Sequence, residues 1–223
     1  MEKHFHREFE SLKQQLMNMA RKVQDMLKDT IDALVKLDKC AVEKVKVLEH
    51  EVNLQEIDID SQCLKLIALY QPVGQDLRLL NIISKINNDL ERLGDEAINI
   101  CERVCRIIKD PKIDNENVLS KMEKMAIDMI NKSIEGLEKN DASFSEEIFR
   151  MEETLDDLNK KLTISVIEQI KKRPDITDTA LDIISISHRL ERIGDIAVNI
   201  TEDIIFFITG EDTRHPFDQK KQG

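Results

Sequence analysis

A repeated pair of carboxylates is the feature of this sequence best suited to chemistry. Glu91 and Asp95 stand four residues apart in the motif Leu-Glu-Arg-Leu-Gly-Asp, and Glu191 and Asp195 take the same places in Leu-Glu-Arg-Ile-Gly-Asp, 100 residues later. Over the eleven positions that begin with each motif, eight are identical. Residues four apart on a helix lie about 40° apart around its axis, so each pair projects from one face. Paired carboxylates on one face indicate a cation-binding site.

A second polar row precedes each copy of the motif. Its members are Glu49, Asn53, Glu56 and Asp60 in the first half of the chain, and Glu152, Asp156 and Asn159 in the second. These rows also have helical spacing and border apolar residues. If the two acid-bearing helices of each half are consecutive and antiparallel, their rows flank one apolar seam. We therefore expect each half to form one carboxylate-lined groove.

The donor atoms define the ligand such grooves can take. Carboxylates brought together repel one another unless they are protonated or neutralised by a cation. Oxygen ligands suit Mg²⁺, Ca²⁺, Mn²⁺ and ferric iron, and zinc also accepts carboxylates. The second half has the fuller set, because Asp156 stands where the first half has Asn53, and His188 can add a nitrogen where the first half has Asn88. We expect the first site to be weaker or to prefer another metal.

Acidic pairs are also common on solvated helix faces, where Arg92 and Arg192 can balance their charge. Two features favour metal binding over that interpretation: the duplication itself, and the glycines Gly94 and Gly194 inside the two motifs. A mid-helix glycine costs about 1 kcal/mol relative to alanine. Its repetition indicates that a neighbouring helix packs closely beside each acidic row.

Composition limits the class of protein. The 223 residues include 6 Gly, 4 Pro, 1 Tyr and no Trp, which is typical of helices rather than sheets. The net charge of −11 argues against nucleic acid as a direct partner, because nucleic-acid binding rests on basic surface. No targeting segment is recognised at the start, and no apolar run approaches the ~18 residues of a membrane span. We expect a cytoplasmic protein.

Apolar residues recur every three or four positions in six long stretches, each a predicted amphipathic helix. The stretches are 5–38, 41–69, 75–109, 118–139, 143–172 and 175–208. Connections between them are short, which favours antiparallel neighbours. The predicted fold is all-α, with two pseudo-symmetric antiparallel three-helix bundles over residues 1–110 and 116–210 and a flexible tail over 211–223.

The four cysteines form no CxxC pair. Cys101 and Cys105 share a helix face and can in principle hold a soft metal. Because Cys40, Cys63 and this pair fall at apolar positions of the helical pattern, we interpret all four as core residues.

The doubled motif Leu-Glu-Arg-[Leu/Ile]-Gly-Asp resembles that of the PhoU family, regulators associated with bacterial phosphate-specific transport. Other segments agree along the whole chain: His4-Phe5, Leu69-Tyr70-Gln71-Pro72-Val73, Asp76-Leu77-Arg78 and Ile208-Thr209-Gly210-Glu211-Asp212 with Arg214-His215. The resemblance implies two three-helix bundles, often in a homodimer, with multinuclear iron or zinc clusters in some members. The matching metal positions are Glu91/Asp95, Glu191/Asp195 and Glu152/Asp156, while Glu49/Asn53 departs from the pattern at its asparagine.

The resemblance also implies a function. PhoU-like proteins are negative regulators of phosphate uptake and of the phosphate-starvation response. They are thought to contact the ATPase subunit of the phosphate ABC transporter and a membrane sensor histidine kinase. We therefore expect a non-enzymatic adaptor that reaches the inner membrane only through these partners.

Two alternatives remain open. One is a carboxylate-bridged di-metal enzyme, although such sites use Glu-x-x-His pairs inside a four-helix core, and the motifs here have Glu-x-x-x-Asp. The other is a purely structural interaction protein whose acidic rows meet only solvent. The sequence contains no glycine-rich cradle for phosphate.

Overall fold

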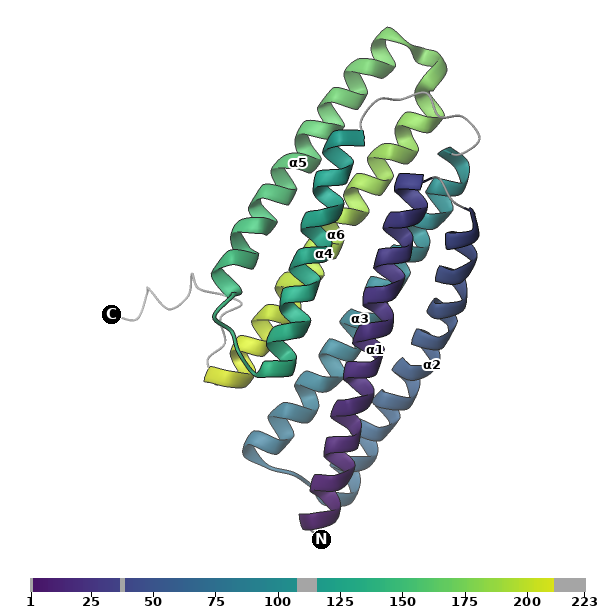
Figure 1. Cartoon of the computed structure of the whole chain (residues 1–223). Helices are drawn as coiled ribbons and strands as arrows, with labels where there is room; N and C mark the ends of the chain where they lie inside the picture. Colours follow the sequence, from purple (N-terminus) through teal and green to yellow (C-terminus); the bar gives the residue numbers. More distant parts are fainter. Residues whose placement is uncertain (1, 37–38, 108–115, 211–223) are drawn as a thin grey trace, which may run out of the picture.

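The computed structural model describes residues 2–36, 39–107 and 116–210, and in these ranges every long element is a helix (Figure 1). The six helices are α1 (Glu2–Lys36), α2 (Lys39–Tyr70), α3 (Gly74–Ile107), α4 (Glu116–Lys139), α5 (Ser145–Lys172) and α6 (Thr177–Thr209). A short 3₁₀ turn, η1 (Pro174–Ile176), precedes α6. The all-α prediction is confirmed, and no described helix is long and apolar enough to cross a membrane.

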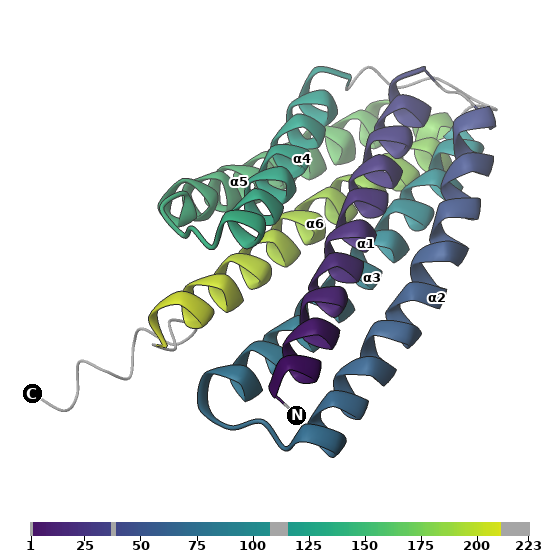
Figure 2. The ribbon, with the colours of Figure 1, turned by 60° about the horizontal axis from the view of Figure 1, so that its bottom comes forward.

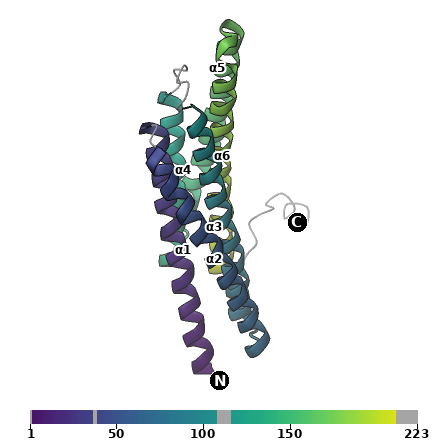
Figure 3. The ribbon, with the colours of Figure 1, turned by 90° about the vertical axis from the view of Figure 1, so that its right-hand side faces the viewer.

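The helices form two three-helix bundles. Helices α1, α2 and α3 pack pairwise on one another, and so do α4, α5 and α6 (Figure 2). The turned view in Figure 3 shows the helices running along the length of an elongated molecule. The two bundles predicted from the internal repeat are therefore present. Their predicted linker and tail, 111–115 and 211–223, lie outside the described residues.

The core follows the predicted apolar spacing. Leu12, Val52 and Leu90 of the first bundle are fully buried, as are Leu155 and Leu190 of the second. Cys63 and Cys101 are buried and Cys105 packs against the core, as predicted, whereas the Cys40 side chain is not described. Phe149 is only half-buried, because the adjacent Ile148 takes the fully buried position.

Helix ends differ from the predicted ones where turn chemistry decides them. Helix α5 begins at Ser145, two residues later than predicted, because the Asp141 carboxylate accepts hydrogen bonds from the Ser143 backbone N–H and hydroxyl, both 2.9 Å long. Helix α6 begins at Thr177 after the 3₁₀ turn that Pro174 opens. Lys39 and Cys40, expected in a turn, already belong to α2.

The end of α6 shows a standard helix stop. Gly210 has a φ of +75°, and its backbone N–H donates to the Phe206 carbonyl at 2.9 Å. Residues with a side chain rarely adopt this left-handed backbone conformation, which is why glycine ends the helix here.

The two bundles join mainly through α3 and α6, with a smaller contact between α1 and α4. Residues early in α3 meet residues late in α6, so the pair is antiparallel. Lys85 Nζ lies 3.0 Å from Asp203 Oδ1, and at the other end Arg103 Nη1 lies 3.1 Å from Asp182 Oδ1. Since α3 and α6 carry the repeated motifs, this packing brings the two motifs to the centre of the molecule.

Candidate functional site

The second-half groove lies between α5 and α6. Glu152 and Asp156 are one helical turn apart on α5, and Glu191 and Asp195 are one turn apart on α6. Asp195 is exposed and the other three are half-buried, so the row borders the core, as the helical geometry predicted. Leu155 and Leu190 fill the seam beneath the groove.

Electrostatics indicate that the two rows face each other. Burial raises the pKa of Glu152, and the Asp195 and Asp156 carboxylates raise it further. Burial likewise raises the pKa of Glu191, with added repulsion from Asp195, Asp156 and Glu152. The pKa of Asp195 is raised by partial desolvation of its carboxyl group and by the negative charge of Asp156. Each affected carboxylate therefore feels at least one carboxylate from the facing helix, and the sequence prediction that α5 and α6 share one groove agrees with this geometry.

One cation already enters this groove. Lys160 Nζ lies 2.5 Å from Asp156 Oδ2. Its positive charge partly offsets the rise in the pKa of Glu152. The Lys160 side chain is 64% exposed, so it can swing into solvent at little cost. A metal ion that bound Asp156 would displace this lysine.

His188 is exposed and is held by a polar chain from α5. Asn159, itself buried, accepts a hydrogen bond from the Ser187 hydroxyl at 2.6 Å, and its amide nitrogen lies 3.1 Å from His188 Nδ1. With Nδ1 accepting from this amide, the neutral imidazole carries its proton on Nε2. His188 can then offer Nδ1 to a metal only after its hydrogen bond with Asn159 is broken.

The first-half groove between α2 and α3 repeats the arrangement. Glu49, Asn53 and Glu91 are half-buried, and Asp95 is exposed. Burial raises the pKa of Glu91, with Asp95, Glu56 and Glu49 adding to the effect. The pKa of Asp95 is raised by partial desolvation of its carboxyl group and then by the negative charge of Glu49. The carboxylates of α2 therefore act on those of α3.

Asn53 makes the first groove different. Its amide nitrogen donates to Glu49 Oε1 at 2.6 Å, a bond that the aspartate at the equivalent position of α5 cannot make. Asn53 thus supplies a neutral donor that partly satisfies the neighbouring carboxylate. At this one position the first groove therefore carries one negative charge fewer than its second-half equivalent.

The two grooves adjoin across the α3–α6 pair. The pKa of Asp195 would be higher still without two arginines, since the positive charges of Arg192 on α6 and Arg92 on α3 partly offset the rise. The arginines form their ion pairs elsewhere: Arg92 Nη1 lies 2.9 Å from Asp89 Oδ1, and Arg192 Nη1 lies 3.4 Å from Glu96 Oε1. They moderate the negative potential of the grooves without occupying them.

The donor chemistry fits a hard cation, yet the side chains are not gathered around one point. In residues 2–36, 39–107 and 116–210, no three His, Cys, Asp or Glu side chains converge closely enough to hold a metal ion. The carboxylates of the two rows are near enough to repel one another but do not point at a common centre. Their side chains would have to change rotamer before they could share one metal ion. Metal binding by these grooves therefore stays a prediction.

Sequence reasoning missed the buried charges between the bundles. Glu96, 6% exposed, accepts a hydrogen bond from Arg189 Nη1 at 2.5 Å and forms an ion pair with Arg192. Asp182 forms ion pairs with Arg103 and Arg106. One clue was present: Glu96 is one of the three positions at which the two eleven-residue copies differ, with Ile196 in the second.

A buried acid on α4 was also missed. Glu123 is 2% exposed, and burial raises its pKa to about 7. Its position in the apolar pattern of α4 gave no indication of chemistry.

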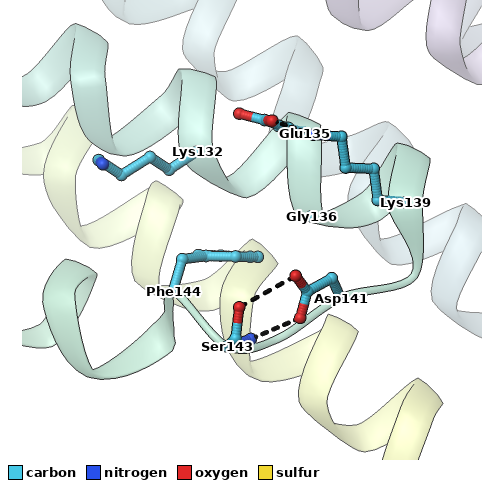
Figure 4. Close-up of a pocket in the computed structure, with 7 residues that line it drawn as sticks. All are labelled: Lys132, Glu135, Gly136, Lys139, Asp141, Ser143 and Phe144. Atoms are coloured by element: carbon cyan, nitrogen blue, oxygen red, sulfur yellow. Dashed lines mark hydrogen bonds and ion pairs between the residues drawn. The ribbon is translucent and has the colours of Figure 1, made fainter.

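A separate pocket of about 200 Å³ lies at the turn between α4 and α5 (Figure 4). Its charged side chains are already engaged: Lys139 pairs with Glu135, Lys132 with Glu147, and Asp141 with Ser143. Phe144 occupies the space beside Gly136. We find no free charge in this pocket to recognise a ligand, and it contains none of the predicted site residues.

Fold and site together define a class: an all-helical protein of two repeated three-helix bundles, each with a carboxylate groove beside a central helix pair. The PhoU domain profile matches residues 16–104 and 119–204, one match for each bundle. The chain belongs to the PhoU family.

Individual relatives agree over nearly the full length. A Burkholderia protein named "Phosphate-specific transport system accessory protein PhoU homolog" is 35% identical, with 95% of this chain and 91% of the relative aligned. The crystal structure of PhoU from Pseudomonas aeruginosa matches with a TM-score of 0.89 at 28% identity, covering 93% of this chain and all of that one. The phosphate transport system regulatory protein PhoU from Streptococcus pneumoniae gives 0.85 at 26% identity, covering 93% and 98%.

Proposed function

We propose that this protein is a non-enzymatic accessory protein of phosphate-specific transport that represses phosphate uptake and the phosphate-starvation response. The observation that carries the proposal is the full-length match to relatives named as accessory proteins of that system. The proposed setting is the cytoplasm. The proposed partners are the ATPase subunit of the phosphate transporter and a sensor histidine kinase, through which the protein reaches the inner membrane. The proposed active form is a homodimer.

A reporter of the phosphate-starvation response tests this function. In a strain that lacks the protein, we expect the reporter to be active in abundant phosphate, and the full-length chain supplied on a plasmid should restore repression. Continued repression in the deletion strain would refute the proposed function.

We further propose that the α5–α6 groove binds a metal ion through Glu152, Asp156, Glu191 and Asp195. Support comes from the facing carboxylates, whose mutual repulsion a cation would relieve. When bound, a cation would draw the two helices together and stabilise the bundle. The α2–α3 groove, with Asn53 and its bond to Glu49, is the weaker candidate.

Elemental analysis of protein purified without chelator, compared with the Asp195→Asn variant, tests the metal site. Loss of metal in the variant is the expected result, and equal metal content in both proteins would exclude the groove. The same samples address the enzyme alternative, since an oxidase or hydrolase activity that disappears in Glu191→Ala would favour catalysis over the adaptor role.

A further inference from the structure

Helix α2 has apolar residues on a face that no other helix covers in the described part of the chain. Val47, Leu54, Ile57 and Leu64 are 56–63% exposed, although the buried face of the same helix carries its own apolar row. Their spacing of seven, three and seven residues places them within a stripe about 100° wide that extends about 25 Å along the helix. We call these four residues the α2 stripe. Its length and spacing match one face of a second helix.

Three of the four equivalent positions in the second bundle are charged. Aligning Glu49 and Asn53 with Glu152 and Asp156 puts Arg150, Asp157 and Lys160 at the positions of Val47, Leu54 and Ile57. All three are exposed. The fourth position, that of Leu64, holds Ile167, which is 42% exposed. The repeat therefore does not require apolar residues at the other three positions, and charges there favour solubility of the helix. The unbroken row of four apolar residues is found on α2 and not on α5.

An acidic row runs along one edge of the α2 stripe. Glu49, Glu56 and Asp60 lie between the stripe and the buried face, at angles worked from about 100° per residue. Two of these carboxylates have neutral hydrogen-bond partners, Asn53 for Glu49 and Ser84 for Asp60. Their negative charge remains available to a partner's cations. The opposite edge is mixed: Glu51 pairs with Lys22, and Lys65 with Glu8.

At one end the α2 stripe opens into a cavity of about 610 Å³ between α2, α3 and the end of α6. Leu64 and Asp60 line it, so it joins the stripe and the acidic row. Apolar side chains form most of its remaining wall, among them Ile67, Leu77 and Phe206. Such a cavity accepts one bulky apolar side chain, the usual anchor of a helix bound in a groove.

We propose that the α2 stripe is a docking site for an amphipathic helix of a partner protein, with apolar residues along its centre and Lys or Arg along one edge. The partner's apolar face covers the stripe, an anchor side chain enters the cavity, and the basic edge pairs with the acidic row. The biological meaning rests on the proposed adaptor function, but the surface itself is defined by α2.

A synthetic helical peptide of 18 residues, with Leu at heptad a and d positions and Lys along one edge, tests the surface. Binding to the full-length protein is followed by fluorescence anisotropy. The test variant is Leu54→Asp/Ile57→Lys, which installs the residues of the second bundle at unchanged net charge. The matched control, Ile164→Asp/Ile167→Lys, makes the same change at the two exposed isoleucines of α5.

The peptide should bind the wild type and the control equally and the test variant at least about tenfold more weakly. Replacing the edge Lys residues by Glu should weaken binding by a similar factor, and added salt should weaken the Lys peptide. Absence of binding, or equal loss in both variants, overturns the proposal. So does a change from dimer to monomer in the test variant by light scattering, which would assign the α2 stripe to a second copy of this chain.

The reporter strain separates this proposal from the proposed function. If the deletion strain is derepressed, the control variant should restore repression and the test variant should fail. Restoration by both variants refutes docking at the α2 stripe and leaves the regulatory function intact. If the deletion strain stays repressed, the regulatory function fails, while the peptide measurement still decides whether the surface binds a basic amphipathic helix.

Discussion

The glycines of the two motifs should respond oppositely to the same substitution. An alanine methyl at Gly94 would lie 3.6 Å from both Met26 Cε and Val52 Cγ1, which is ordinary van der Waals contact. At Gly194 the methyl would lie 2.6 Å from Leu155 Cδ2, and Leu155 is 1% exposed. The motif is the same, but the space beside it is not.

The magnitudes follow from two terms. Replacing a mid-helix glycine by alanine stabilises a helix by about 1 kcal/mol. Forcing a buried side chain aside costs about 1–3 kcal/mol. Gly94→Ala should therefore gain about 0.5–1 kcal/mol, whereas Gly194→Ala should range from neutral to a loss of about 2 kcal/mol. At about 2–4 °C per kcal/mol for a chain of this size, the two variants should melt about 1–12 °C apart.

Thermal unfolding followed by circular dichroism, with urea titration as a second probe, measures the difference. Because each variant serves as the control for the other, effects of helix propensity cancel in the comparison. An equal gain in stability from both substitutions would refute the packing argument, and would mean that Leu155 can move aside without cost.

Three further predictions concern charge. Because burial raises the Glu123 pKa to about 7, the folded protein retains that proton to higher pH than the unfolded chain, and stability is lost as pH rises from about 4.5 through 7. In denaturant titrations, Glu123→Gln should therefore be more stable than wild type by about 2–3 kcal/mol at pH 8 and by under about 1 kcal/mol at pH 5. Glu96→Gln should lower stability by about 2 kcal/mol in the same assay because Arg189 loses its counter-ion, and an unchanged midpoint would contradict a structural role for this pair. Zn²⁺ or Mn²⁺ at 100 times its Kd should raise the melting temperature by about 5–10 °C in wild type but not in Asp195→Asn, and an equal shift in both would place the ion elsewhere.

Helix content and the position of the acidic rows were predictable because both depend on local periodicity. The spacing of Glu191 and Asp195 fixes their angle to the buried Leu190 at the edge of the core. The half-buried position of Glu191 and the raised pKa values of both carboxylates agree with that placement. Helix ends were less predictable. The Asp141 turn and the 3₁₀ turn at Pro174 depend on particular hydrogen bonds that periodicity does not report.

The side-chain partners within the grooves could not be read from spacing. Whether Asn53 turns to Glu49, or Asn159 to Ser187 and His188, depends on rotamers and on the register of two packed helices. The same holds for the role of Glu96. Its difference from Ile196 was visible in the sequence, but its arginines come from the other bundle, and only the tertiary packing identifies them.

The ion pairs between α3 and α6 have a consequence for how repeated halves find each other. If two copies of α3 met in the same register, Lys85 would face Arg103, and Glu96 would face Asp89 as well as Arg92. Two copies of α6 would set Asp182 against Asp203. An interface between identical units must use each residue twice, once on each side, whereas a duplicated chain can give the two sides opposite charges. The charges at these positions therefore favour pairing of α3 with α6 over pairing of either helix with a second copy of itself.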